Sequence, residues 1–377
     1  MKEKTIFIVA GESSGDLHGS RLAKAIKKLD PEIKICGTGG SLMQTSGVEI
    51  YYNFLELAVV GFWEVLKNLG KFRSIFKLLV KKLEEVKPDL VVLIDYPGFN
   101  LRFAKEVKRR NIKLVYYISP QVWAWGRKRI RLIKRLVDKM IVIFKFEEGL
   151  YKSYGIDAVF VGHPLLDMVK PSQTKNALLE KYKIDYSKKI ISLLPGSREM
   201  EIRRHLPILL ETAKLISQKI PDVEFTISRA PHLPNGLFSS LLSNFPISVL
   251  VLENSYDCIE LADFVLVSSG TATLETAILG KPMLIIYKTS FLTWLIIKPQ
   301  IKIPYVGMVN IVAKEEVVPE FVQYKARPEK ISQKVTELLN NPEELKKMKE
   351  KLEMVKNRLG TLGAAERAAK IVYEMVL

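Results

Sequence analysis

Two turns rich in glycine and serine carry residues suited to binding phosphate. Residues 268–271 follow an apolar run, and residues 194–198 (LPGSR) follow another. Backbone amides at such strand-to-helix turns, together with the positive end of the helix dipole, bind anions. Arg198 can add two parallel charge-assisted hydrogen bonds; a solvated arginine beside a capping turn is the alternative. The pattern predicts a diphosphate site made of Gly196, Ser197, Arg198, Ser269, Gly270, Thr271, Ala272 and Thr273.

Glu275 lies one helical turn beyond the second of these turns. A carboxylate at that place can accept hydrogen bonds from the two hydroxyls of a ribose. We therefore predict that the diphosphate belongs to a nucleotide. An ordinary strand-to-helix turn is the alternative for this stretch taken alone.

Asp95 is the candidate catalytic base. It ends the apolar run 90–94 (LVVLI) and is followed by Pro97 and Gly98. Because ligands on parallel sheets bind at the carboxyl ends of strands, this carboxylate is placed to take a proton from a substrate. A helix cap or a loop ligand is the alternative role. Asn100 is its predicted polar partner and a predicted contact of the acceptor substrate.

Other polar clusters also follow predicted strands and are assigned to the acceptor substrate. They comprise Glu12, Ser13, Ser14, Gly15 and Asp16 in one stretch and Ser119, Gln121 and Trp123 in another. Ser14 and Asp16 can instead cap the helix that follows them. His163, between Gly162 and Pro164, is either a substrate contact or a buried hinge residue.

Short apolar runs alternate with helical patterns in both halves of the chain, which is typical of parallel sheets covered by helices on both faces. Runs at 5–10, 33–37, 91–95, 114–119, 139–144 and 158–161 predict the first sheet, and a helix is expected from about residue 17 to 29. Runs at 190–194, 223–228, 248–252, 264–267 and 283–287 predict the second. The fold class is therefore α/β, with two doubly wound Rossmann-like domains facing each other across a cleft.

The expected domain boundaries follow from this alternation. We expect an N-terminal domain over 1–168, a C-terminal domain over 169–345 and C-terminal helices over 346–377 that can pack back on the first domain. A chain of 377 residues agrees with two domains.

The composition limits the possible partners. The net charge is +17, from 58 Lys+Arg and 41 Asp+Glu, and implies an anionic partner or a lysine-rich proteome. The two cysteines have no metal-type spacing. No signal-peptide layout and no apolar run of about 20 residues is found. We expect a cytoplasmic chain without cofactor or metal, and no nucleic-acid partner, since its aromatic residues cluster with aliphatic ones.

The segment 57–83 is more apolar than a helix covering a sheet requires. Its lysines and aromatic residues suit a helix lying in a membrane interface, whereas a core helix with one solvated face is the alternative. The predicted membrane or acyl-chain contacts are Val59, Val60, Phe62, Trp63, Leu66, Leu69 and Phe72. A second apolar run, 290–297, joins it in suggesting an amphipathic substrate.

Seven motifs occur together in the order that is found in lipid-A-disaccharide synthases. They are GESSGD at 11–16, LIDYPGFN at 93–100, SPQVWAW at 119–125, GHP at 162–164, LLPGSR at 193–198, SSGTATLE at 268–275 and VGMVN at 306–310. The chain resembles this family from its first strand to about residue 320. Ser13 departs from the alanine of many relatives, and the three residues after the aspartate, 96–98, also vary from the family pattern.

The resemblance implies a GT-B glycosyltransferase that works without metal at the cytoplasmic face of the inner membrane, against its anionic lipids. It would join UDP-2,3-diacylglucosamine to 2,3-diacylglucosamine 1-phosphate, giving the β-1′,6-linked disaccharide 1-phosphate and UDP with inversion. Asp95 matches the family's proposed base, Arg198 a residue that neutralises the diphosphate, and Glu275 the ribose site. Asn310 matches a polar residue needed in the site, and Glu12 an acidic residue of the first loop.

Two other interpretations stay open. One is another GT-B enzyme acting on a UDP-amino sugar, such as a UDP-N-acetylglucosamine 2-epimerase, which would need no groove for acyl chains. The other is a basic, non-enzymatic membrane-binding protein, for which Asp95→Asn would be harmless.

Overall fold

The computed structural model describes residues 4–54, 69–124, 129–243, 245, 247–290, 294–295 and 304–377. The chain divides into two compact units, each with its own parallel sheet. The first unit contains Met1–Pro164 and Leu359–Leu377, and the second contains Leu165–Arg358. The first unit is thus discontinuous, because the chain returns to it after completing the second.

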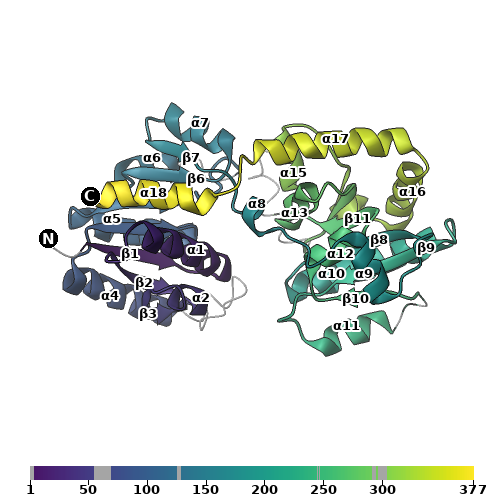
Figure 1. Ribbon diagram of the computed structural model, residues 1–377, viewed down its shortest axis with the longest axis horizontal. Helices are drawn as coiled ribbons and strands as arrows, with labels where there is room; N and C mark the ends of the chain where they lie inside the picture. The colour runs from purple at the N-terminus through teal and green to yellow at the C-terminus, as the bar shows by residue number, and fades with distance from the viewer. Residues whose placement is uncertain are drawn as a thin grey trace. The chain divides into compact units, whose positions relative to one another are not determined.

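The first unit is built on a seven-stranded sheet in the order β3-β2-β1-β4-β5-β6-β7, with all neighbours parallel. Figure 1 shows β1, β2 and β3 at one side of this sheet and β6 and β7 at the other. The central strands β1, β4 and β5 are almost entirely buried, which explains their continuous apolar sequences. Its strands are β1 Thr5–Ala10, β2 Lys34–Gly39, β3 Glu49–Asn53, β4 Leu90–Ile94, β5 Lys113–Tyr117, β6 Lys139–Val142 and β7 Ala158–Phe160. The helices between them are α1 Ser13–Leu29, α2 Ser41–Gln44, α4 Leu69–Val86, α5 Pro97–Arg109, α6 Arg129–Leu136 and α7 Lys145–Ser153.

The second unit has a six-stranded parallel sheet in the order β10-β9-β8-β11-β12-β13. Its strands are β8 Lys189–Leu194, β9 Val223–Ser228, β10 Leu250–Leu252, β11 Phe264–Ser268, β12 Met283–Tyr287 and β13 Glu320–Val322. Its helices are α8 Leu165–Met168, α9 Lys175–Tyr182, α10 Glu199–Ser217, α11 Asn235–Leu242, α12 Ser255–Leu261, α13 Ala272–Ile278, α15 Met308–Ala313, α16 Pro328–Leu339 and α17 Pro342–Arg358, with the 3₁₀ turn η3 Gln323–Lys325. The two sheets confirm the predicted pair of Rossmann-like domains.

The last helix, α18 Ala364–Val376, packs against α1 of the first unit (Figure 1). Arg367 fixes this return of the chain: it donates hydrogen bonds to the carbonyl oxygens of Val161, Thr361 and Leu362. The amide of His163 donates to the carbonyl of Leu359 over 2.8 Å. Helix α17, by contrast, belongs to the second unit.

Two details differ from the expectations: the start of helix α1 and the presence of two edge strands. Helix α1 begins at Ser13 and not near Leu17, because Glu12 is already extended and acts as its N-cap. Strands β3 and β13 were not predicted; both are edge strands with half-buried residues, so their sequences lack a continuous apolar run.

Among the described residues, no helix combines the length and apolar character that crossing a membrane requires.

Candidate functional site

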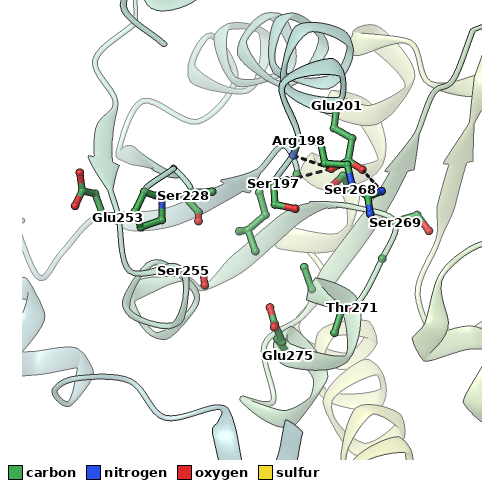
Figure 2. Close-up of a pocket in the computed structure, with 16 residues that line it drawn as sticks. Ser197, Arg198, Glu201, Ser228, Glu253, Ser255, Ser268, Ser269, Thr271 and Glu275 are labelled. Carbon is green, nitrogen blue, oxygen red and sulfur yellow. Dashed lines mark hydrogen bonds and ion pairs between the residues drawn. The ribbon is translucent and has the colours of Figure 1, made fainter. Parts of the chain in front are cut away.

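The two glycine- and serine-rich turns of the second unit lie side by side because β8 and β11 are neighbours in the sheet. Both turns follow the carboxyl ends of these parallel strands and line one pocket of about 420 Å³. Figure 2 shows Ser197 and Arg198 at one side of the pocket and Thr271 and Glu275 at another. The ends of β9 and β10 complete the pocket with residues that were not predicted, among them Ser228, Glu253 and Ser255.

Gly196 and Glu201 determine the conformation of the first turn. Gly196 has φ of +117°, a conformation that favours glycine. The Glu201 carboxylate accepts hydrogen bonds from the amides of Ser197 and Arg198, at 3.0 and 3.3 Å, and pairs with the Arg198 guanidinium at 3.5 Å (Figure 2). Arg198 is exposed, with 67% of its side chain accessible, so its guanidinium can reach a ligand.

The second turn separates supporting residues from residues that face the pocket. Ser269 donates its hydroxyl to the Val306 carbonyl at 2.9 Å, and buried Thr273 donates to the Gly270 carbonyl at 2.8 Å. Thr271 is exposed at the pocket, at the start of α13. The first amides of a helix have no partner within it, so the turn presents donors to the pocket at 270–272.

Glu275 is a half-buried carboxylate of the pocket, one turn into α13. Burial raises its pKa from 4.5 to about 7, and a hydrogen bond with the Tyr256 side chain partly opposes that rise. Figure 2 shows its carboxylate directed into the pocket. It is therefore both an acceptor for hydroxyl groups and a group that changes its charge near neutral pH.

Asn310 does not line this pocket. It is fully buried, its amide nitrogen donates to the Val318 carbonyl and to Glu320, and its oxygen accepts from the amides of Val317 and Val318. Glu320 in turn accepts from the amides of Val306 and Gly307. Since Ser269 bonds to Val306, this network supports the second turn. The nucleotide contact of Asn310 stays a prediction.

Asp95 follows β4 of the first unit in an unusual backbone conformation. Asp95 and Tyr96 have φ of +44° and +46°, in the left-handed region that costs about 1–2 kcal/mol for each residue other than glycine. The Asp95 carbonyl accepts hydrogen bonds from Asn100 Nδ2 at 2.8 Å and from Tyr116 Oη at 2.6 Å. Buried Asn100 is thus a partner of Asp95 through the main chain, and these bonds hold the turn that presents the carboxylate.

Burial, and then the neighbouring charge of Glu12, raise the pKa of Asp95 from 3.8 to about 6. A hydrogen bond from the Tyr96 backbone partly opposes this rise. Glu12 follows β1, which is the neighbour of β4 in the sheet. A carboxylate with a pKa near 6 is a stronger base than an ordinary aspartate and is still ionised at neutral pH. The environment therefore suits proton abstraction.

The predicted cluster at residues 12–16 divides into exposed and buried members. Glu12, Ser13 and Ser14 are exposed at the start of α1, whereas Gly15 and Asp16 are buried. The Asp16 carboxylate accepts from the amides of Gly40, Leu42 and Met43 at 2.7–3.1 Å. Asp16 therefore caps α2 rather than α1, and its contact with substrate stays a prediction.

Ser119 and Trp123 are joined by Glu147, a residue that no sequence pattern had indicated. The Ser119 hydroxyl and the Trp123 indole both donate to Glu147 Oε1, at 2.7 and 3.0 Å. Glu147 is buried, and burial raises its pKa from 4.5 to about 7 against the hydrogen bonds that it accepts. Gln121, between the other two in sequence, is exposed. Glu147 thus fixes the loop after β5.

His163 is buried against the ring of Phe144, with ring centroids 4.9 Å apart. Burial, followed by the charge of His18, lowers the pKa of His163 to about 3, so the imidazole is neutral near pH 7. Burial and Arg21 likewise lower the pKa of His18, to about 4.

Within the described ranges, no three His, Cys, Asp or Glu side chains gather into a potential metal site.

The predicted apolar contacts are only partly described. Val59, Val60, Phe62, Trp63 and Leu66 lie outside the described residues, as does most of 290–297, and nothing is described of the Leu69 side chain. Phe72 is half-buried on α4.

The two parallel-sheet units define a GT-B-type fold; Asp95 lies in the first unit and the pocket after β8 and β11 lies in the second. The chain is similar over its whole length to solved structures of this class. Examples are MnaA of S. aureus in a structure with UDP (TM-score 0.68, 14% identity, 100% of this chain and 98% of that one) and a putative UDP-N-acetylglucosamine 2-epimerase of Listeria monocytogenes (TM-score 0.66, 14% identity, 99% and 96%). At these identities the likeness shows the fold alone.

The sequence comparison identifies the family. Residues 6–373 match the family model described as lipid-A-disaccharide synthetase. A lipid-A-disaccharide synthase of Syntrophus aciditrophicus is 42% identical over 100% of this chain and 99% of its own length. The chain belongs to the lipid-A-disaccharide synthase family of glycosyltransferases, and its role is synthesis of the lipid A disaccharide from a UDP-sugar and a lipid acceptor.

Proposed function

We propose that the enzyme moves 2,3-diacylglucosamine from UDP to the 6-hydroxyl of 2,3-diacylglucosamine 1-phosphate, giving the β-1′,6-linked disaccharide 1-phosphate and UDP. The observation that carries this proposal is the Asp95 carboxylate, held on a fixed turn with its pKa raised to about 6.

In the proposed reaction, Asp95 takes the proton of the acceptor 6-hydroxyl. The oxygen forms a bond to the anomeric carbon as the bond from that carbon to the diphosphate oxygen breaks, and the configuration inverts. Negative charge develops on the departing UDP. Arg198 and the amides at 270–272 stabilise this charge, and Glu275 accepts hydrogen bonds from the ribose.

Glu201 has to share its donors with the diphosphate. Its carboxylate now accepts from the amides of Ser197 and Arg198 and pairs with the Arg198 side chain. Two anions cannot both hold these donors without repulsion. We infer that the ion pair between Glu201 and the Arg198 guanidinium breaks when UDP binds, and that the guanidinium then pairs with the diphosphate.

The proposal includes peripheral binding to an inner-membrane surface with anionic lipids. The net charge of +17 and the apolar, lysine-containing segment 57–83 support it. Replacing Phe62 and Trp63 with serine is expected to weaken binding to anionic vesicles. Unchanged vesicle binding would contradict this part of the proposal.

The test of the reaction is UDP release from UDP-2,3-diacylglucosamine, with and without the acceptor and in the presence of a chelator. We expect acceptor-dependent release that persists in chelator, falls at pH values below about 6, and is lost in Asp95→Asn. Turnover of unacylated UDP-N-acetylglucosamine, with none of the acylated pair, would refute it.

A further inference from the structure

We propose that a groove between α4 and α5 in the first unit binds an acyl chain and the 1-phosphate of the acceptor lipid. This inference rests on the reaction proposed above and names a subsite for its acceptor. The groove has a volume of about 570 Å³ and is lined by residues of α4 and α5 together with Tyr96. This volume falls within the range of about 300–1,000 Å³ that is usual for small-ligand sites.

The floor of the groove is aromatic. Phe72, Phe76, Tyr96 and Phe99 line it. The Phe76 and Phe99 rings meet edge to face with centroids 5.7 Å apart, and Tyr96 lies 6.3 Å from Phe99. These ring contacts form a continuous apolar surface, against which an alkyl chain can bury its own apolar surface.

Three cationic side chains also line the groove. Arg73, Lys77 and Arg102 are exposed and line the groove. In the part of the chain that the structure describes, none of the three forms an ion pair. Cations farther along the same helices do pair: Lys82 with Glu85 and Arg109 with Glu106. An apolar floor with uncompensated positive charge at its edge complements a molecule that has both an alkyl chain and a phosphate.

The position of Tyr96 assigns the groove to the acceptor. Tyr96 follows Asp95 directly and shares its left-handed turn. Its ring packs so closely on Gly11 that a Cβ there would lie 2.3 Å from it. A lipid seated on Tyr96 is therefore next to the proposed base, whereas the nucleotide pocket belongs to the second unit.

Gly98→Leu is the variant that fills the groove without disturbing the fold. Gly98 lines the groove in the first turn of α5, and a Cβ built on it meets no atom within 4 Å. Leucine also has a higher helix propensity than glycine. We expect Gly98→Leu to raise the KM for the acceptor at least tenfold, while the KM for UDP-2,3-diacylglucosamine and the melting temperature do not fall.

The charged edge is tested by Arg102→Ala and Lys77→Ala, with Arg109→Ala as the matched control on α5. Loss of one charge-assisted contact to phosphate is expected to raise the acceptor KM about tenfold. The control should leave it unchanged. With the dephosphorylated acceptor, wild type and Arg102→Ala should have the same KM, because the lost contact is to the phosphate.

Acyl contact is tested with acceptors of graded chain length. Each methylene buried in the groove should lower the wild-type KM roughly fourfold until the groove is full. In Gly98→Leu this dependence should flatten. Equal chain-length dependence in both proteins would overturn the acyl part of the inference.

A direct binding measurement separates this inference from the proposed reaction. Calorimetric binding of short-chain 2,3-diacylglucosamine 1-phosphate to the full chain needs no turnover. Binding that is lost in Gly98→Leu and weakened in Arg102→Ala, with no UDP release by wild type, would retain the subsite and reject the reaction. Normal turnover with an unchanged acceptor KM in both variants would reject the subsite alone. Variants that lose only anionic-vesicle binding would show a membrane contact and would also reject it.

Discussion

Replacing Asp95 with asparagine should stabilise the first unit while removing activity. Burial and Glu12 raise the pKa of Asp95 from 3.8 to about 6. One pKa unit corresponds to about 1.36 kcal/mol, so ionising this carboxyl in the folded protein costs up to about 3 kcal/mol at neutral pH. Because Asp95 is not fully buried, we expect a net gain of about 1–2 kcal/mol on its removal. Asparagine also tolerates the left-handed conformation at this position.

The sign of the effect gives a pH signature. Below pH 3.8 the carboxyl is protonated in both states and contributes nothing. As the pH rises from 3.8 to about 6 the unfolded chain loses the proton first, so the folded wild type becomes relatively less stable, and the full penalty is present above about 6. The gain from Asp95→Asn should therefore be largest near pH 8 and about one third as large at pH 4.5.

Calorimetric melting at pH 8 and pH 4.5 measures this gain. For a unit of this size we expect a rise of about 2–8 °C at pH 8. Added UDP should shift only the transition of the second unit, which identifies the first. Asp16→Asn is the control of opposite sign, since that carboxylate accepts three backbone amides and its loss should cost about 1–3 kcal/mol. An Asp95→Asn protein that melts at or below the wild-type temperature at pH 8 would refute the reasoning.

Three further predictions concern single substitutions. Glu275→Gln should raise the KM for the UDP-sugar about tenfold at pH 8 and abolish the wild-type loss of UDP affinity below pH 7, because the Glu275 pKa is about 7; titrating UDP affinity against pH checks both. Glu201→Gln should tighten UDP binding about threefold in calorimetry by removing a competing negative charge near Arg198; weaker binding would contradict this. Gly11→Ala should destabilise the first unit by about 1–3 kcal/mol, because the added Cβ would clash with the Tyr96 ring. An unchanged melting temperature would contradict this close packing.

The sequence determined the two parallel sheets and the places of their strand ends. Strands buried on both faces need continuous apolar residues, and these runs are visible without any partner. The carboxyl end of such a run is also where a ligand meets the sheet, so the local sequence was enough to predict that Asp95, Arg198 and Glu275 follow strand ends. Edge strands β3 and β13 could not be predicted in this way, because half-buried strands do not need a continuous run of apolar residues.

The tertiary structure decided which polar side chains form hydrogen bonds within the fold. Asp16 and Asn310 lie in motifs typical of functional sites. Yet the Asp16 carboxylate accepts hydrogen bonds from main-chain amides at least 24 residues away, and the Asn310 side chain bonds to main-chain groups at least 7 residues away. Glu147 and Glu201 carry no sequence signal and nevertheless hold the Ser119 loop and the Arg198 turn. A buried polar atom needs a partner and an exposed one does not, and only the folded chain brings partners distant in sequence within hydrogen-bond reach.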